Sequence, residues 1–316
     1  MLERLLNTGF DPSGTVGMAA IQESQTIQGL FDQEPLIRDR TVSFCIAHET
    51  PVFKLPEEVN IIQTGDFESP ARIFSVAKYL SRIGIQPRSS YLADYAYLLI
   101  HDLLARYQQD VDQVIFLLHR KFCSISPLGQ TFLRAPHLRL EAAEKLDIAA
   151  ELRAYQGNTL FPIPITFERG IVSNYASCHH LQDFLRLTAL CVDHGILSDQ
   201  EALEFLTSNT LFPCPAVGSL PIDVSLEIAA VGARYVKAVH DAEFVCLEPS
   251  DSYQHRAESF FCERLVSFFL LKSLLKSGIV EADPLGTYRT DPANLGFLIG
   301  VYQGDGGEEN YHHAKG

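Results

Sequence analysis

The chain has 316 residues, of which 47% are hydrophobic and 20% are charged, and its formal net charge is -14. This length and composition are typical of a globular protein with one large or two modest domains. The acidic balance argues against a nucleic-acid partner, because neutralising phosphates requires a basic face. No stretch approaches the roughly 18 uninterrupted apolar residues of a membrane span, and the N-terminus lacks the apolar core of a signal peptide. The seven cysteines are scattered without a Cys-x-x-Cys pair, so we expect reduced thiols in a cytoplasmic protein.

Strands and helices alternate in the first half of the chain, after a polar leader or arm that we expect over residues 1–40. β-branched and aromatic runs indicate strands, and apolar residues three and four apart indicate helices. The expected elements are strands at 41–48 and 59–65, helices at 71–84 and 91–108 (introduced by Ser69-Pro70 and Ser90), and a third strand at 114–118. A strand, helix, helix, strand order favours an α/β fold with an at least partly parallel sheet.

The second half of the chain is predicted to be mostly helical. The expected helices cover 141–155, 181–195, 198–209 and 256–278. Ser198 and Glu201 have the spacing of a capping box. The last helix has a strongly apolar face, which we expect to pack on the body of the protein, with peripheral membrane contact as the alternative. We place the main domain at 41–280 and an extended, partly disordered tail at 281–316.

The sharpest chemical feature is a charged cluster directly after the third strand. Five apolar residues, Val114 to Leu118, lead into His119, Arg120 and Lys121. In open α/β sheets ligands bind beyond the carboxyl ends of the strands, so the cluster is expected at a ligand edge. An arginine fork and a lysine point charge suit a diphosphate. The alternative is an ordinary solvated strand end.

Asp110 and Asp112 are the main competitor for a site in this segment. An Asp-x-Asp motif is typical of a divalent metal held against a nucleotide diphosphate, because carboxylates are hard ligands. Here, however, the motif precedes the strand rather than following it. We interpret it as a polar turn at the opposite end of the sheet and predict no metal site.

Other residues could reach the same edge. His48 and Glu49 close the first strand, with an ordinary loop pair as the alternative. Asp94 and Asp102 lie on one face of the second helix, where either could be a catalytic base or an ordinary solvated charge. The sequence has no Gly-x-Gly-x-x-Gly segment, no Gly-Lys-Ser/Thr loop and no Gly-x-Ser-x-Gly elbow, which disfavours dehydrogenases, P-loop nucleotidases and serine hydrolases.

The order of three segments, FCIAHETPVFKLPEEVNIIQTG, SYLADYAYLLIHDLL and DQVIFLLHRKF, resembles a bacterial glycosyltransferase-like family found in polysaccharide biosynthesis loci. In that family a strand ends in Thr-His-Lys-Pro, a Val-Gly pair and an acidic helix follow, and a later strand ends in His-Tyr-Arg-Arg. Two further segments, ITFERGIVSNYAS and HRAESFFCERLVSFFLL, resemble the family's Asn-Met-Phe-Ile and Glu-Arg-Leu segments. The residues matched to family positions are His48, Thr64, Gly65, Asp94, His119, Arg120, Lys121, Asn174, Glu263 and Arg264.

The resemblance implies a GT-A-like fold, with a mixed, largely parallel sheet flanked by helices and a helix-rich C-terminal half. It implies transfer of a sugar from a nucleotide-diphosphate donor to a saccharide or glycolipid acceptor. Under this hypothesis Arg120 and Lys121 neutralise the leaving diphosphate in place of a metal, and no cofactor is needed. Asp94 or Glu49 is the candidate general base, and His119 positions a group or carries a proton.

The remaining matched residues are then expected to bind substrate, with Asn174 on a sugar hydroxyl. Three departures from the family pattern favour a second hypothesis, a non-catalytic binding protein on the same fold. One residue is inserted between His48 and Pro51, His-Tyr-Arg-Arg becomes His-Arg-Lys-Phe, and Met-Phe-Ile becomes Tyr-Ala-Ser after Asn174.

Overall fold

The computed structural model describes residues 31–88, 92–132, 135–155, 157–247, 256–283 and 287–302. The chain divides into a short unit that ends at Glu34 and a main unit that begins at Pro35. Most of the leader expected at residues 1–40 lies outside the described residues. Its last part belongs to the main unit, where Ile37–Arg38 form the short strand β1.

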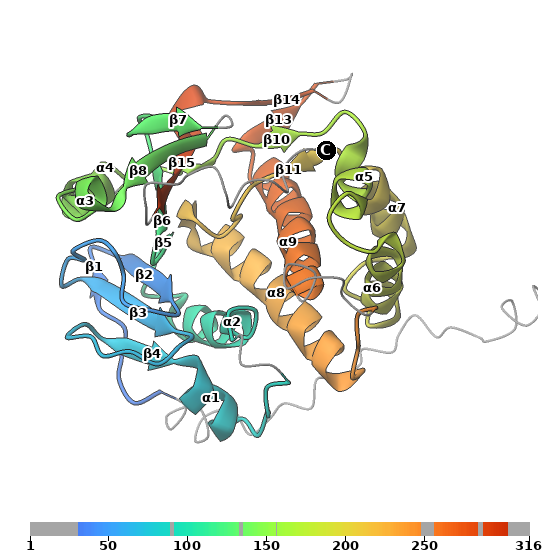
Figure 1. Ribbon diagram of the computed structural model, residues 1–316, viewed down its shortest axis with the longest axis horizontal. Helices are drawn as coiled ribbons and strands as arrows, with labels where there is room; N and C mark the ends of the chain where they lie inside the picture. The colour runs from blue at the N-terminus through green and yellow to red at the C-terminus, as the bar shows by residue number, and fades with distance from the viewer. Residues whose placement is uncertain are drawn as a thin grey trace, which may run out of the picture. The chain divides into compact units, whose positions relative to one another are not determined.

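The main unit is built on a mixed sheet (Figure 1). Its other strands are β2 (Thr41–Ala47), β3 (Val59–Gln63), β4 (Ile73–Ser75), β5 (Gln113–Leu118), β6 (Lys121–Ser124), β7 (Gln130–Phe132), β8 (Ala135–Arg139), β9 (Phe161–Pro162), β12 (Gly218–Pro221) and β15 (Leu295–Tyr302). The order is β4-β3-β2-β5-β6-β15-β8-β7, with β1, β12 and β9 attached to β2, β5 and β15. The strands β4, β3, β2 and β5 are all parallel, which confirms the predicted parallel arrangement.

Helices cover this sheet and dominate the second half of the chain (Figure 1). They are α1 (Val76–Arg82), α2 (Ala96–Tyr107), α3 (Leu140–Ala143), α4 (Ile148–Tyr155), α5 (Gly170–Ala176), α6 (Leu181–Asp193), α7 (Asp199–Thr207), α8 (Ile222–Asp241) and α9 (Ala257–Lys276), with a 3-10 turn at Pro292–Asn294. Helix α8 packs between α2 and α9. Two separate two-stranded antiparallel sheets pair β10 (Ile165–Thr166) with β11 (Thr210–Leu211) and β13 (Val280–Ala282) with β14 (Tyr288–Thr290). The expected fold class, a mixed, largely parallel sheet flanked by helices with a helix-rich C-terminal half, is confirmed.

The capping box and the long apolar helix are both as expected. The Ser198 hydroxyl accepts a hydrogen bond from the Glu201 amide, and the Glu201 carboxylate accepts one from the Ser198 amide. In α9, Leu265, Phe268 and Phe269 are buried, so its apolar face packs on the body of the protein. Within the described part of the chain, no helix is both long enough and apolar enough to cross a bilayer.

The helix expected over 71–84 is wrong in its first part. Ile73–Ser75 pair with β3 as strand β4, and the helix begins only at Val76. Ser75, rather than Ser69, is the N-cap, because its hydroxyl accepts from the Lys78 amide. Pairing with an existing strand edge outweighs the helical spacing of these few residues.

The helix expected over 141–155 is interrupted near its middle. Helix α3 ends at Ala143, and α4 starts at Ile148. The Asp147 carboxylate accepts a hydrogen bond from the Ala150 amide at 3.1 Å and so starts a new helix.

The segment expected to be an extended tail contributes a strand to the sheet. Strand β15 lies between β6 and β8, antiparallel to the first and parallel to the second. A side chain at Gly296 would collide with the Cys123 sulfur, since a Cβ there would lie 2.2 Å from it. The main unit therefore extends past residue 280, to Tyr302 at least, and residues 303–316 of the expected tail lie outside the described residues.

A close contact between α8 and α2 gives a testable consequence. A Cβ at Gly232 would lie 2.4 Å from the ring of Tyr97. Gly232→Ala gains about 1 kcal/mol of helix propensity, but overpacking costs about 1–3 kcal/mol. We expect a net loss of stability, measured as a lower urea midpoint. In a Tyr97→Ala background the same substitution should stabilise the protein, and a stabilising effect in the wild-type background would contradict the close contact.

Candidate functional site

The site lies in the parallel part of the sheet, at the point where the order in which the chain adds strands reverses. From β2 the chain continues to β3 and β4 on one side, and then returns to β5 on the other side of β2. This is a topological switch point, where open α/β sheets leave a crevice beyond the carboxyl ends of the strands. His48 and Glu49 follow β2, and His119 and Arg120 form the turn after β5. The predicted position of the charged cluster is thus confirmed.

Backbone hydrogen bonds fix these strand ends. The His119 amide donates to the Ile46 carbonyl at 3.1 Å, and the His119 carbonyl accepts from the Val52 amide at 3.0 Å. The loop after β2 therefore folds back onto the turn after β5. As a result, His48 and Glu49 are held against His119.

Thr64 and Gly65 support the same loop from β3. The Thr64 amide donates to the Ala47 carbonyl at 2.8 Å, and its side chain is buried. A Cβ at Gly65 would lie 1.9 Å from the carbonyl oxygen of His48, so only glycine fits. Both residues position His48 through the backbone, and their direct contact with substrate stays a prediction.

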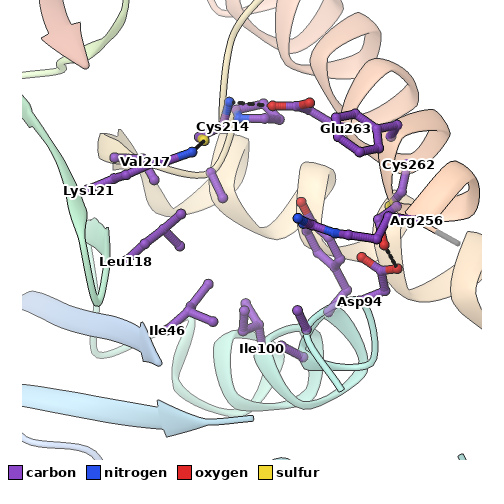
Figure 2. Close-up of a pocket in the computed structure, with 17 residues that line it drawn as sticks. Ile46, Asp94, Ile100, Leu118, Lys121, Cys214, Val217, Arg256, Cys262 and Glu263 are labelled. Carbon is purple, nitrogen blue, oxygen red and sulfur yellow. Dashed lines mark hydrogen bonds between the residues drawn. The ribbon is translucent and has the colours of Figure 1, made fainter. Parts of the chain in front are cut away.

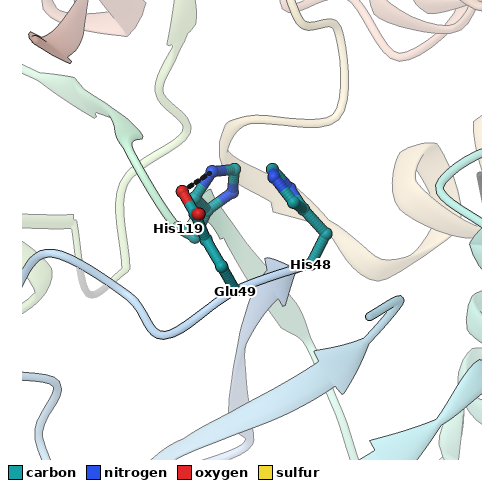
Figure 3. A group of neighbouring side chains, drawn as sticks. All are labelled: His48, Glu49 and His119. Carbon is teal, nitrogen blue, oxygen red and sulfur yellow. Dashed lines mark ion pairs between the residues drawn. The ribbon is translucent and has the colours of Figure 1, made fainter. Parts of the chain in front are cut away.

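The side chains at these strand ends face one another (Figure 3). The rings of His48 and His119 meet edge to face with centroids 4.2 Å apart. The His119 Nε2 atom lies 3.5 Å from Glu49 Oε1, and the Arg120 guanidinium forms an ion pair with the same carboxylate oxygen. Arg120 is therefore already paired with Glu49, which weakens its predicted role at a diphosphate.

Among the described residues, His48, Glu49 and His119 have the geometry of a metal-ligand group. One ligand atom from each lies within 4.8 Å of the others. No metal site is predicted from the sequence, because Asp110 and Asp112 precede their strand. The sequence does not show His48, Glu49 and His119 as one group, since they come from two segments that only the pairing of β2 with β5 brings together.

His119 should stay neutral under ordinary conditions. Burial, followed by the nearby His48, lowers the pKa of the His119 imidazole to about 4, against an opposing effect of Glu49. NMR spectra of the protein, treated with a chelator to remove any metal, should contain one imidazole signal that titrates near pH 4 rather than 6.5. The same signal should be absent from the His119→Gln variant. In the unfolded state His119 has its ordinary pKa and therefore binds a proton at a higher pH than in the folded state. The free energy of unfolding should consequently fall as the pH drops from about 6.5 to 4. A His119 signal titrating near 6.5 would show that the ring is solvated.

A pocket of about 290 Å³ lies beside these strand ends (Figure 2). Ile46 and Leu118 line it from the carboxyl ends of β2 and β5, and Lys121 lines it from the start of β6. The first turns of α2 and α9 and the loop 214–217 complete its wall. In the first turn of α2 the amides of Ala96, Tyr97 and Leu98 already donate to carbonyls of residues 92–95. Side chains, rather than these amides, are therefore the donors available to an anion in the pocket.

Charged groups lie on two sides of this pocket (Figure 2). On one side the Lys121 ammonium lies 3.7 Å from the Cys214 sulfur, and Glu263 accepts a hydrogen bond from the Cys214 amide at 2.9 Å. On the other side are Asp94 and Arg256, at the starts of α2 and α9. Lys121 and Arg256 are both solvent-exposed, so an incoming anion can reach them.

Asp94 is the carboxylic acid most altered by its surroundings in this pocket. Burial raises the pKa of its carboxyl, and this exceeds the opposing effects of a Ser259 hydrogen bond and the Arg256 charge. The Ser259 hydroxyl donates to Asp94 Oδ2. A carboxylate with a raised pKa in a pocket suits a general base.

Neither Asn174 nor Arg264 lines the pocket, although Arg264 contacts the lining residue Phe260. The Arg264 guanidinium donates to the Asn174 side-chain oxygen and to the Phe260 carbonyl, and it lies over the Tyr175 ring. This pair joins α5 to α9. Both side chains thus hold α9 in position, and the contact of Asn174 with a sugar hydroxyl stays a prediction.

Asp112 lies at the opposite end of β5 from His119, as predicted. It is exposed and forms two hydrogen bonds with Arg40, at 2.6 and 2.8 Å. Arg40 directly precedes β2, so this ion pair closes the amino end of the strand pair.

Sequence reasoning missed Arg256 and Ser259. Both lie in the segment HRAESFFCERLVSFFLL, in which only Glu263 and Arg264 are matched to family positions. They reach the pocket because the start of α9 faces the start of α2, and the sequence alone does not reveal that contact.

No protein-family model matches the chain, and no curated protein sequence is significantly similar to it. In fold, the chain is similar to the apo structure of the bifunctional glycosyltransferase WbbM, with a TM-score of 0.52 at 12% identity. The similarity covers 83% of this chain but 46% of that structure, so the chain spans about half of its length. At this identity the similarity shows that the chain shares the α/β fold of that structure.

Proposed function

We propose that this protein is a metal-independent glycosyltransferase of polysaccharide synthesis in the cytoplasm. In this role it moves a sugar from a nucleoside-diphosphate donor to a saccharide or glycolipid acceptor. The observation that carries the proposal is the pocket at the switch point, with Lys121 and Arg256 on opposite sides. The glycosyltransferase-like fold supports it.

The diphosphate is the group that the cations of the pocket suit best. Lys121 and Arg256 can each place positive charge and hydrogen-bond donors on a phosphate oxygen. During transfer, the bond between the anomeric carbon and the diphosphate oxygen breaks, and negative charge grows on the leaving diphosphate. Two fixed cations stabilise that charge in place of a metal.

Asp94 is the base in this mechanism. An acceptor hydroxyl loses its proton to the Asp94 carboxylate as its oxygen bonds to the anomeric carbon. Its raised pKa makes the carboxylate a stronger base than an ordinary aspartate. Glu49 is less suitable, because Arg120 and His119 already contact it.

The remaining residues of the site position this machinery. Glu263 holds the loop that carries Cys214, Thr64 and Gly65 hold His48, and Asn174 fixes Arg264 on α9. Each acts through the backbone or through another side chain.

Calorimetric titration with UDP and GDP, with and without EDTA, tests the proposal. We expect one of the two to bind in the micromolar range (about 8 kcal/mol) and EDTA to leave its affinity unchanged. If neither nucleotide binds, donor recognition is wrong. If EDTA abolishes binding, the metal-independent part alone is wrong.

A further inference from the structure

The group His48, Glu49 and His119 is not needed by the donor pocket, and its chemistry points to a different ligand. One ligand atom from each side chain lies within 4.8 Å of the others. Bonds of about 2.1 Å in a tetrahedral arrangement place ligand atoms about 3.4 Å apart. The three ligand atoms must therefore move closer together when an ion binds, and His48 is exposed, which leaves its ring room to turn.

The donor set selects the kind of ion. Two imidazole nitrogens and one carboxylate oxygen suit zinc, cobalt or nickel, whereas magnesium and calcium prefer all-oxygen surroundings. Three protein ligands leave a further position for water, as is typical of open zinc sites.

The surroundings hold these ligands in place as metal sites require. The backbone of His119 is bonded on both sides, to Ile46 and to Val52, and the carbonyl of His48 packs on Gly65. Arg120 contacts the Glu49 carboxylate, and a hydrogen-bonded second partner of this kind commonly orients a ligating carboxylate.

We propose that His48, Glu49 and His119 bind one divalent transition-metal ion of the zinc class at the carboxyl ends of β2 and β5. The ion links the two strands across the switch point. It is separate from the cations that hold the donor diphosphate, so this inference does not depend on the proposed function.

The test uses the full-length protein after chelator treatment and dialysis, titrated with zinc and cobalt in the absence of nucleotide. We expect one tight equivalent, a cobalt visible spectrum of tetrahedral or five-coordinate type, and no comparable binding of magnesium. Bound zinc should also raise the thermal midpoint, because it binds the folded state.

Two variants decide whether these residues are the ligands. His48→Ala and Glu49→Gln should each weaken zinc affinity by at least about tenfold, the scale seen even for residues behind the ligands. Both side chains are at least partly exposed, so the fold should be kept, as circular dichroism would verify. His194→Ala is the matched control, since it removes an exposed imidazole at the end of α6.

Histidine pairs elsewhere in the sequence, such as His312-His313, can also take up zinc. The zinc affinities of the variants, rather than the number of zinc ions bound, therefore show whether His48 and Glu49 are ligands. Equal zinc affinity in the wild type, His48→Ala and Glu49→Gln would overturn the proposal, as would the absence of any tight zinc or cobalt binding. UDP or GDP titrations in EDTA report on the donor pocket alone, so failure of one proposal is distinguishable from failure of the other.

Discussion

Replacing Lys121 and Arg256 together by alanine is expected to lower the affinity for the bound nucleoside diphosphate by at least about 100-fold. A hydrogen bond to a charged group contributes about 1.5–3 kcal/mol, and about 1.4 kcal/mol corresponds to a tenfold change in affinity. Both side chains are exposed in the pocket, so their removal should leave the fold intact. Calorimetric titration of wild type and variant measures the difference.

Lys276→Ala is the control for this experiment. Lys276 is in the last turn of α9, far along the helix from Arg256, and its side chain is 79% exposed. The Lys276→Ala substitution removes a positive charge that lies outside the pocket, so the affinity for the nucleoside diphosphate should not change. If the double variant binds as tightly as the control, the diphosphate lies elsewhere.

Asp94→Asn is expected to reduce sugar transfer by about 100-fold to 10,000-fold, the usual contribution of a general base. Nucleotide affinity should change little, because the base acts on the acceptor hydroxyl and not on the diphosphate. The measurement is kcat for the donor and acceptor found active in a screen, together with the dissociation constant of the nucleotide. Since burial raises the pKa of Asp94, activity should fall on acidification at a higher pH than an ordinary aspartate would give.

Ser259→Ala is the matched control for this substitution. It removes the hydrogen bond to Asp94 but keeps the carboxylate. Sugar transfer should persist in this variant. On acidification its activity should fall at a still higher pH than in the wild type, because the lost hydrogen bond lowers the Asp94 pKa. An Asp94→Asn variant with wild-type kcat would rule out Asp94 as the base.

The part of the site that lies at the carboxyl ends of strands could be predicted from the sequence. The apolar run before His119 and the β-branched run before His48 identify two buried strands, and general rules place ligands beyond their carboxyl ends. The same rule correctly separates Asp112, which precedes its strand, from the site.

What the sequence could not supply depends on contacts between distant segments. Strand β15 finds its place between β6 and β8 although nothing in its local pattern indicates a partner. Helix α8 was not predicted, although its apolar residues gather on one side of the helix and the signal was therefore present in the sequence. The roles of Arg256 and Arg264 likewise depend on how α9 meets α2 and α5.

The measurement that tests the central claim most directly is a crystal structure of the protein grown with the nucleoside diphosphate that it binds. The account predicts the diphosphate in the pocket beyond β2 and β5, with phosphate oxygens within hydrogen-bond distance of Lys121 and Arg256. A nucleotide ordered at another surface, with this pocket filled by solvent alone, would contradict it.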